Sequence, residues 1–161
     1  MKNSNQRKQE LQQKVQQAGT DVLNSERFRA ARDIPHHPHV SVAQHSLHVA
    51  EESCRIAEWL NRHGWHVRVE DAIRCGLLHD IGMTENKVFS SPSWIKAYTH
   101  PNRGVEVAEE EYHLSEEQAD AIRRHMWPVC IIPPVHTLGW IITAADKISS
   151  VKEILFGNKE D

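Results

Sequence analysis

The chain has 161 residues, of which 39% are hydrophobic and 25% charged, a balance that is typical of one globular domain and excludes a disordered chain. Its net charge of −3, with histidine counted as neutral, argues against an extended nucleic-acid interface, because neutralising many phosphates takes a basic excess. Three isolated cysteines without a CxxC pair, and the lack of a signal-peptide or membrane-spanning pattern, predict a cytoplasmic protein without disulfide bonds or a cysteine zinc site.

The N-terminal part of the chain predicts helices on both sides of one loop. A narrow apolar stripe favours a helix over residues 2–18, and a second, short helix is expected over 21–31. The segment DIPHHPHVS contains two prolines and is expected to be a loop. A long helix should follow over residues 42–62, because Ser41 is a suitable N-cap and the apolar positions repeat with a helical period.

The rest of the chain also has helical rather than strand patterns. Helices are expected over residues 69–80, 100–112, 115–126 and 135–155, with a helical turn around 94–98 and a loop over 81–92. Pro101 suits the first turn of the helix that begins at residue 100. The chain is therefore predicted to be all-α, a single bundle of about six to seven helices, with residues 1–31 as an N-terminal helical extension and 32–161 as the main domain.

Histidine is unusually frequent, with 12 residues spread along the chain. His45 shares the apolar face of the 42–62 helix with Val49 and Ile56, a position more typical of a core residue than of a metal ligand when taken alone. His48 is turned away from that face and is expected to lie beside the site or on the surface. Histidine is the commonest metal ligand in proteins, so the positions of the others decide its role here.

Three further elements favour a metal site over isolated polar residues. His79 and Asp80 end an apolar helix, where a neutral nitrogen and a hard oxygen can both reach one cation. Asp146 follows the apolar stretch LGWIITAA, and a carboxylate there is costly to bury without a partner or a metal. His100 and His125 lie at helix ends, from which ligands can converge.

The remaining histidines are expected to be ordinary polar residues. Three of them lie in the proline-containing loop, which we expect to be solvated: His36, His37 and His39. Four others are expected at surface or loop positions: His63, His66, His113 and His136.

The ordered set resembles the HD-domain superfamily of metal-dependent phosphohydrolases. The phrases VAQHSLHVA, GLLHDIG and AADKISS are similar to that family's motifs, in the same order, over roughly residues 40–150. The segments HPNRG and RRHMWP resemble the subset with two additional histidines, which implies a two-metal centre. A GYP segment is lacking, which argues against a cyclic dinucleotide as substrate.

The resemblance implies an HD domain over residues 32–161 and a ligand set for each of two metals. The first metal would be held by His45, His79, Asp80 and Asp146, and the second by Asp80, His100 and His125, so that Asp80 bridges them. Mixed nitrogen and oxygen ligands suit iron or manganese, and we expect two divalent transition-metal ions.

The leading functional hypothesis is a phosphomonoesterase or phosphodiesterase that acts on a small phosphate ester, for instance a nucleotide, through a metal-bridging hydroxide. Asp80 and Lys147 are the candidate catalytic residues, and Arg124 is the candidate substrate-binding residue. Lys147 and Arg124 are charged neighbours of Asp146 and His125 that could contact a phosphate. Solvent-facing positions are the competing interpretation for both.

Two other functions remain open at this point. A di-iron oxygenase of the HD type would use the same six ligands, and a non-catalytic metal-binding module would keep the fold for regulation. The expected partner is a small phosphorylated molecule, with no membrane and no extended nucleic acid. A homodimer through the N-terminal helix is a further candidate.

Overall fold

A computed structural model describes residues 3–156 of the chain and is built almost entirely of helices. The α-helices are α1 (Ser4–Ala18), α2 (Thr20–Asn24), α3 (Glu26–Ala30), α4 (Val42–Arg62), α5 (Val69–Leu78), α6 (Asn86–Phe89), α7 (Ser93–Tyr112), α8 (Glu116–Arg124) and α9 (Thr137–Phe156). Two 3-10 turns, η1 (Ala31–Asp33) and η2 (Ile81–Thr84), and a small hairpin of β1 (Pro35–His37) and β2 (Val40–Ser41) complete the described part. The predicted all-α class is confirmed.

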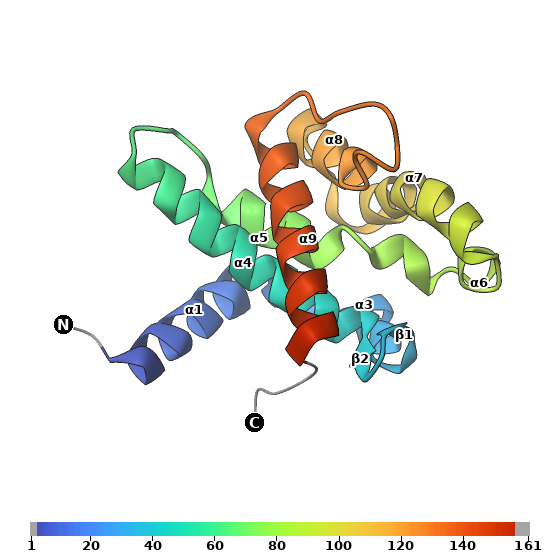
Figure 1. The fold of residues 1–161 in the computed structure, drawn as a ribbon, viewed down its shortest axis with the longest axis horizontal. Helices are drawn as coiled ribbons and strands as arrows, with labels where there is room; N and C mark the ends of the chain where they lie inside the picture. The colour runs from blue at the N-terminus through green and yellow to red at the C-terminus, as the bar shows by residue number, and fades with distance from the viewer. Residues whose placement is uncertain (1–2, 157–161) are drawn as a thin grey trace.

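The centre of the bundle is formed by α4, which packs against α5, α9 and α1 (Figure 1). In the same view α9 crosses in front of α4, while α7 and α8 lie together on the other side of α5. The 42–62 helix has the predicted bounds, because its N-cap Ser41 forms a reciprocal capping box with Gln44. This arrangement brings the C-terminal ends of α5 and α8 and the interior of α7 close to the inner faces of α4 and α9.

The N-terminal helices share the main hydrophobic core. Val15 of α1, Val22 of α2 and Phe28 of α3 are buried in the same cluster as Ile73 and Leu77 of α5. The division into an extension over residues 1–31 and an HD domain over 32–161 stays a prediction. Within the described residues, no helix is both long enough and apolar enough to cross a lipid bilayer.

Two N-terminal segments differ from the prediction. The helix expected over residues 21–31 is interrupted at Ser25, whose hydroxyl accepts a hydrogen bond from the backbone N–H of Phe28 and so begins a new helix. The loop expected over 33–41 contains the β1–β2 hairpin, which turns through His39 in a left-handed conformation (φ 68°). A hydrogen bond from the N–H of Val42 to the carbonyl of Ile34 closes the base of the hairpin.

The expectation of a short turn around residues 94–98 and a separate helix from His100 was wrong. One helix, α7, runs through Pro101 without a break. Proline has no N–H, so the carbonyl of Ala97, one turn earlier, has no helical donor. The thiol of Cys130 donates to that carbonyl (S–O 3.7 Å), so a tertiary contact replaces the missing helical bond. The neighbouring segment 81–92, expected to be a loop, forms η2 and α6.

The three cysteines lie at different depths. Cys54 and Cys75 are buried, and Cys130 is half-buried. Burial raises the pKa of the Cys54 thiol to about 11, so it stays protonated at neutral pH. No pair of them forms a disulfide.

Removing the capping hydroxyl in Ser41→Ala is expected to lower the free energy of unfolding by about 1 kcal/mol, because the N–H of Gln44 loses its acceptor. Urea denaturation of the two proteins measures this difference. Ser91→Ala is the control, since its hydroxyl donates to the carbonyl of Lys87 at an exposed position and its loss should cost less than about 0.5 kcal/mol. Equal stability of the two variants would contradict the role assigned to the cap.

Candidate metal centre

The six predicted ligands converge from five parts of the fold. They are His45 on α4, His79 and Asp80 at the end of α5, His100 in α7, His125 directly after α8, and Asp146 on α9. Nε2 of His45 lies 3.1 Å from Oδ1 of Asp146, and Nε2 of His79 lies 4.0 Å from the same oxygen. These three residues form one group in which the candidate ligand atoms all lie within 4.8 Å of one another.

Asp80 occupies the middle of the cluster. Its Oδ1 lies 3.1 Å from Nε2 of His100 and 3.6 Å from Nε2 of His125, while its Oδ2 lies 3.5 Å from Nε2 of His79. Helix α5 ends at Leu78, two residues earlier than predicted, so His79 and Asp80 lie in the turn that follows. His79 keeps helical backbone angles, Asp80 departs from them (φ −105°, ψ 9°), and both side chains reach the cluster.

Three of the histidine rings are oriented by the backbone of their own helices. Nδ1 of His79, His100 and His125 lies 2.8, 2.6 and 2.7 Å from the carbonyl oxygens of Gly76, Lys96 and Ile122, respectively. A carbonyl only accepts, so each Nδ1 must carry the proton. In the neutral rings, each Nε2 therefore presents a lone pair to the cluster.

Burial and charge together set the protonation of the cluster. Burial lowers the pKa of His79 to about 4, so its Nε2 is an unprotonated nitrogen at neutral pH. Burial alone would raise the pKa of the Asp80 carboxyl, but the imidazole rings that surround it, those of His79, His100, His125 and His36, favour its charged form and hold the pKa well below its usual range. Burial likewise acts against the charged form of His45, yet hydrogen bonds to Asp146 and Glu153 raise its pKa to about 10.

The donor atoms fit divalent metal ions. Nε2 of His79 is buried and has no hydrogen-bond partner. Nε2 of His100 and Nε2 of His125 lie 3.1 Å apart, so in the neutral rings two lone pairs face each other, and a shared proton or a bound cation between them would relieve their repulsion. Two nitrogens bound to one metal at about 2.1 Å each lie about 3.0–3.4 Å apart, which matches this separation. Metal binding would release the protons that otherwise neutralise these groups.

Lys147 and Arg124, the predicted catalytic and substrate-binding cations, have different surroundings. Nζ of Lys147 lies 3.5 Å from Oδ2 of Asp146 and donates to the carbonyl of His125 at 3.1 Å, so its charge lies at the edge of the cluster. The guanidinium of Arg124 pairs with Asp120 (2.8 Å) and donates to the carbonyl of Pro133 (3.0 Å). These contacts hold the loop after α8, and a substrate contact by Arg124 stays a prediction.

His36 was expected in a solvated loop, and this expectation was wrong. Its Nε2 lies 2.9 Å from Oδ2 of Asp80, and its ring stacks on that of His45 with centroids 4.1 Å apart. The hairpin folds β1 over the cluster, a placement that the local sequence does not encode. Nε2 of His37 lies 3.3 Å from Oγ of Ser150 on α9, whereas His39 is exposed as expected.

Glu153 was not among the site residues predicted from the sequence. Its buried carboxylate contacts Nδ1 of His45 at 3.0 Å and Nδ1 of His48 at 2.7 Å. His48 thus lies beside the site, one of its two predicted positions. Glu153 is seven residues after Asp146, two helical turns along the same face of α9, and this spacing was the available signal.

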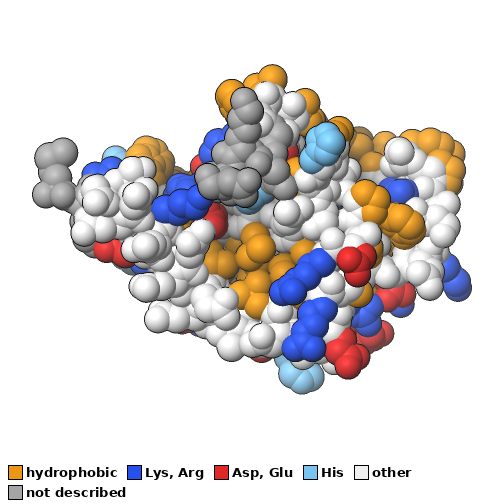
Figure 2. Space-filling view, turned by 90° about the horizontal axis from the view of Figure 1, so that it is seen from below, with side chains coloured by type: hydrophobic (Ala, Val, Ile, Leu, Met, Phe, Trp, Pro, Cys, Tyr) orange, Lys and Arg blue, Asp and Glu red, His pale blue; other side chains and the backbone are white. Residues whose placement is uncertain are grey.

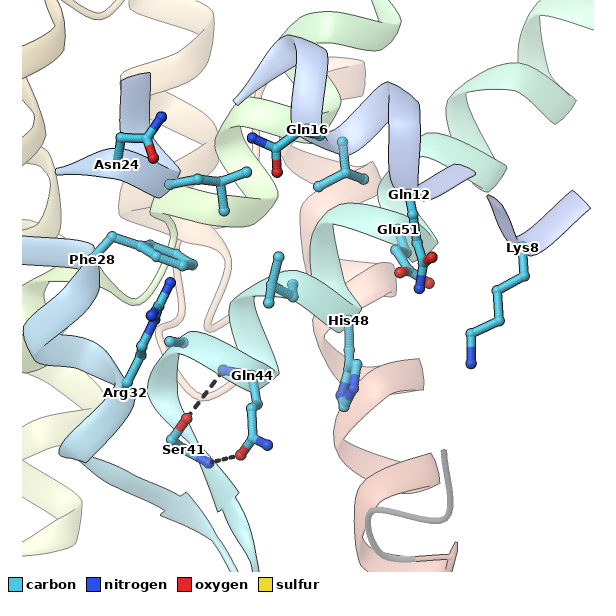
Figure 3. Close-up of a pocket in the computed structure, with 14 residues that line it drawn as sticks. Lys8, Gln12, Gln16, Asn24, Phe28, Arg32, Ser41, Gln44, His48 and Glu51 are labelled. Atoms are coloured by element: carbon cyan, nitrogen blue, oxygen red, sulfur yellow. Dashed lines mark hydrogen bonds between the residues drawn. The ribbon is translucent and has the colours of Figure 1, made fainter. Parts of the chain in front are cut away.

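A separate groove of about 790 Å³ lies between α1, α3 and the first turns of α4 (Figure 3). Its lining combines apolar residues, among them Val15, Leu23 and Phe28, with polar side chains from α1 and α4. Figure 2 shows the underside of the molecule, where hydrophobic side chains lie in a hollow next to Lys and Arg side chains. His48 lines the groove at the end near α9, so the groove reaches the outer side of the Glu153 contacts.

A comparison with protein-family models gives one informative match. The model described as HD domain matches residues 42–150, well over half of the chain. A search of curated proteins and a search of solved structures gave no significant match. The matched range contains all six residues of the cluster, whereas His36 and Glu153 lie outside it. The chain belongs to the HD domain family.

Proposed function

We propose that this protein is a metal-dependent phosphohydrolase that acts on a small phosphate ester, for instance a nucleotide. The observation that carries the proposal is the set of inward-facing Nε2 atoms around Asp80, which includes a buried nitrogen without a partner on His79. Such a set binds cations rather than an organic ligand, and membership of the HD domain family supports hydrolysis as the reaction.

The six residues would hold two divalent ions, one beside His45 and Asp146 and the other beside His100 and His125, with Asp80 between them. Bound there, the ions would lower the pKa of a water molecule towards neutrality and neutralise charge on the phosphoryl oxygens. Iron and manganese suit this donor set.

The protein's own groups would position the substrate and limit its size. Nζ of Lys147, held by the carbonyl of His125, places a positive charge where an anionic substrate would approach Asp146. The hairpin that carries His36 covers the other side of the cluster. A centre enclosed in this way accepts a compact phosphate group more readily than an extended polymer.

Metal removal provides the first test. Protein purified without a histidine tag should contain about two equivalents of transition metal by elemental analysis. Treatment with EDTA should abolish phosphate release from a panel of nucleoside monophosphates and bis(p-nitrophenyl) phosphate, and Mn²⁺ or Fe²⁺ should restore it.

Two results would overturn the proposal. Consumption of dioxygen by the iron-loaded, reduced protein, without phosphate release from any substrate in the panel, would favour the oxygenase. Failure to bind metal even after reconstitution would favour a non-catalytic module.

A further inference from the structure

The orientation of His45 differs from that of the other three inward-facing histidines. His79, His100 and His125 each donate their Nδ1 proton to a backbone carbonyl. Nδ1 of His45 instead contacts a side-chain carboxylate, that of Glu153, at 3.0 Å to Oε2 and 3.1 Å to Oε1. Among the four inward-facing histidines, His45 therefore differs in having a carboxylate, that of Glu153, at its Nδ1.

The carboxylate of Glu153 lies inside the fold. Glu153 is 5% exposed and belongs to the last turns of α9. Its oxygens contact Nδ1 of His45 at 3.0 Å and Nδ1 of His48 at 2.7 Å, so two imidazole rings face the carboxylate. A buried carboxylate with histidine partners is costly as a fold element alone, because apolar side chains of similar volume would pack at least as well.

A carboxylate that accepts the Nδ1 proton of a metal-bound histidine has a known physical effect. It fixes the tautomer and the ring orientation, and it makes Nε2 a stronger donor to the metal. Nε2 of His45 faces Oδ1 of Asp146 at 3.1 Å, on the side of the ring opposite to Glu153. Carboxylates on the same face of α9, Asp146 and Glu153, thus contact the two nitrogens of one ring.

We propose that Glu153 is a positioning residue that holds His45 with its Nε2 directed at the metal beside Asp146. The inference rests on the proposed metal centre and extends it beyond the residues that define the family match, which ends at residue 150. Glu153 acts through His45 and does not itself touch the metal.

Mn²⁺ binding to three variants tests this role. Free Mn²⁺ is measured by electron paramagnetic resonance during titration of the metal-free protein, so the readout is independent of activity. Glu153→Gln keeps the shape and one acceptor but removes the charge, and should weaken the site beside His45 about tenfold. Glu153→Ala removes both and should weaken it about a hundredfold. Binding at the second site, beside His100 and His125, should change less.

Glu52→Gln is the matched control. Glu52 on α4 also contacts α9, through Lys152 at 2.8 Å, but no contact joins it to the histidines of the cluster in the described structure. Its variant should bind Mn²⁺ as the wild type does. Thermal unfolding in EDTA checks that each variant folds.

The outcomes separate the two proposals. Wild-type protein that binds no Mn²⁺ would overturn the metal centre and the inference with it. Wild-type protein that binds two equivalents, with both Glu153 variants unchanged in affinity, would leave the proposed function standing and overturn the inference. Equal weakening in Glu52→Gln would also overturn it, because the effect would then come from general contact between α4 and α9.

Discussion

Replacing Asp80 by alanine is expected to remove metal from both sites and to abolish phosphate release. Oδ2 of Asp80 lies 3.5 Å from Nε2 of His79 and 3.9 Å from Nε2 of His45, and its Oδ1 contacts His100 and His125, so the carboxylate faces the ligands of both proposed sites. Metal content should fall from about two equivalents to well under one, and activity should fall by more than about 10²–10³-fold, the loss that follows removal of a transition-state donor. Elemental analysis and a phosphate-release assay measure the two effects.

Comparing His100→Ala with Asp80→Ala tests whether His100 is a ligand of one metal only, while Asp80 is a ligand of both. His100 contacts Asp80 and His125, and no contact joins it to His45 or Asp146 among the described residues. About one equivalent of metal should therefore remain in this variant. Full metal content in Asp80→Ala would show that the bridging assignment is wrong, and equal loss of both metals in His100→Ala would show that the two ions bind cooperatively.

The second large effect is expected at Gly82, where η2 packs on the backbone of α7. A Cβ added there would lie 2.6 Å from the backbone nitrogen of Gly104 and closer still to the carbonyl oxygen of His100. Backbone atoms of a helix cannot rotate aside as a side chain can. Gly82→Ala should thus lower the free energy of unfolding by about 2–3 kcal/mol and displace His100, with partial loss of metal. Urea denaturation in EDTA and elemental analysis measure these changes.

Gly104→Ala is the control for this crossing of η2 and α7. A Cβ at residue 104 would meet a side-chain methyl group of Ile122 at 3.3 Å, which can move by a few tenths of an ångström. Gly104 lies inside α7, where alanine gains up to about 1 kcal/mol over glycine in helix propensity, so the net change should be near zero. A Gly82 variant as stable as this control would show that the close approach of the two backbones can relax.

The parts of the site that were predictable follow from local patterns. Ser41 and the apolar period of the following residues predicted the 42–62 helix with its observed bounds, and with it the inward position of His45. Asp146 was recognisable because an aspartate in an apolar helix needs a partner, and it lies 3.1 Å from His45. Helical periodicity is a local property, so sequence alone can reveal it.

The parts that escaped prediction depend on contacts between distant segments. A helix boundary at Pro101 is the local expectation, but the thiol of Cys130 satisfies the carbonyl that proline leaves without a donor. The approach of His36 to Asp80 depends on how the hairpin packs, and nothing in its own sequence determines that. Glu153 is a different case. Its spacing from Asp146 could be read in the sequence, but that spacing points to the site only because Glu153 is buried, which the sequence alone did not show.

The buried thiols of Cys54 and Cys75 allow partial unfolding of the protein to be followed by their reaction with a thiol reagent. Cys54 lies one turn before Glu58, whose carboxylate pairs with Lys14 of α1, whereas Cys75 lies on α5 with its sulfur near the backbone of α8. A thiol reagent reaches such groups only when the segments above them separate, so labelling rates in native conditions measure the free energies of those openings. Faster labelling of Cys54 than of Cys75 would mark the N-terminal helices as a unit that detaches before the helical bundle opens.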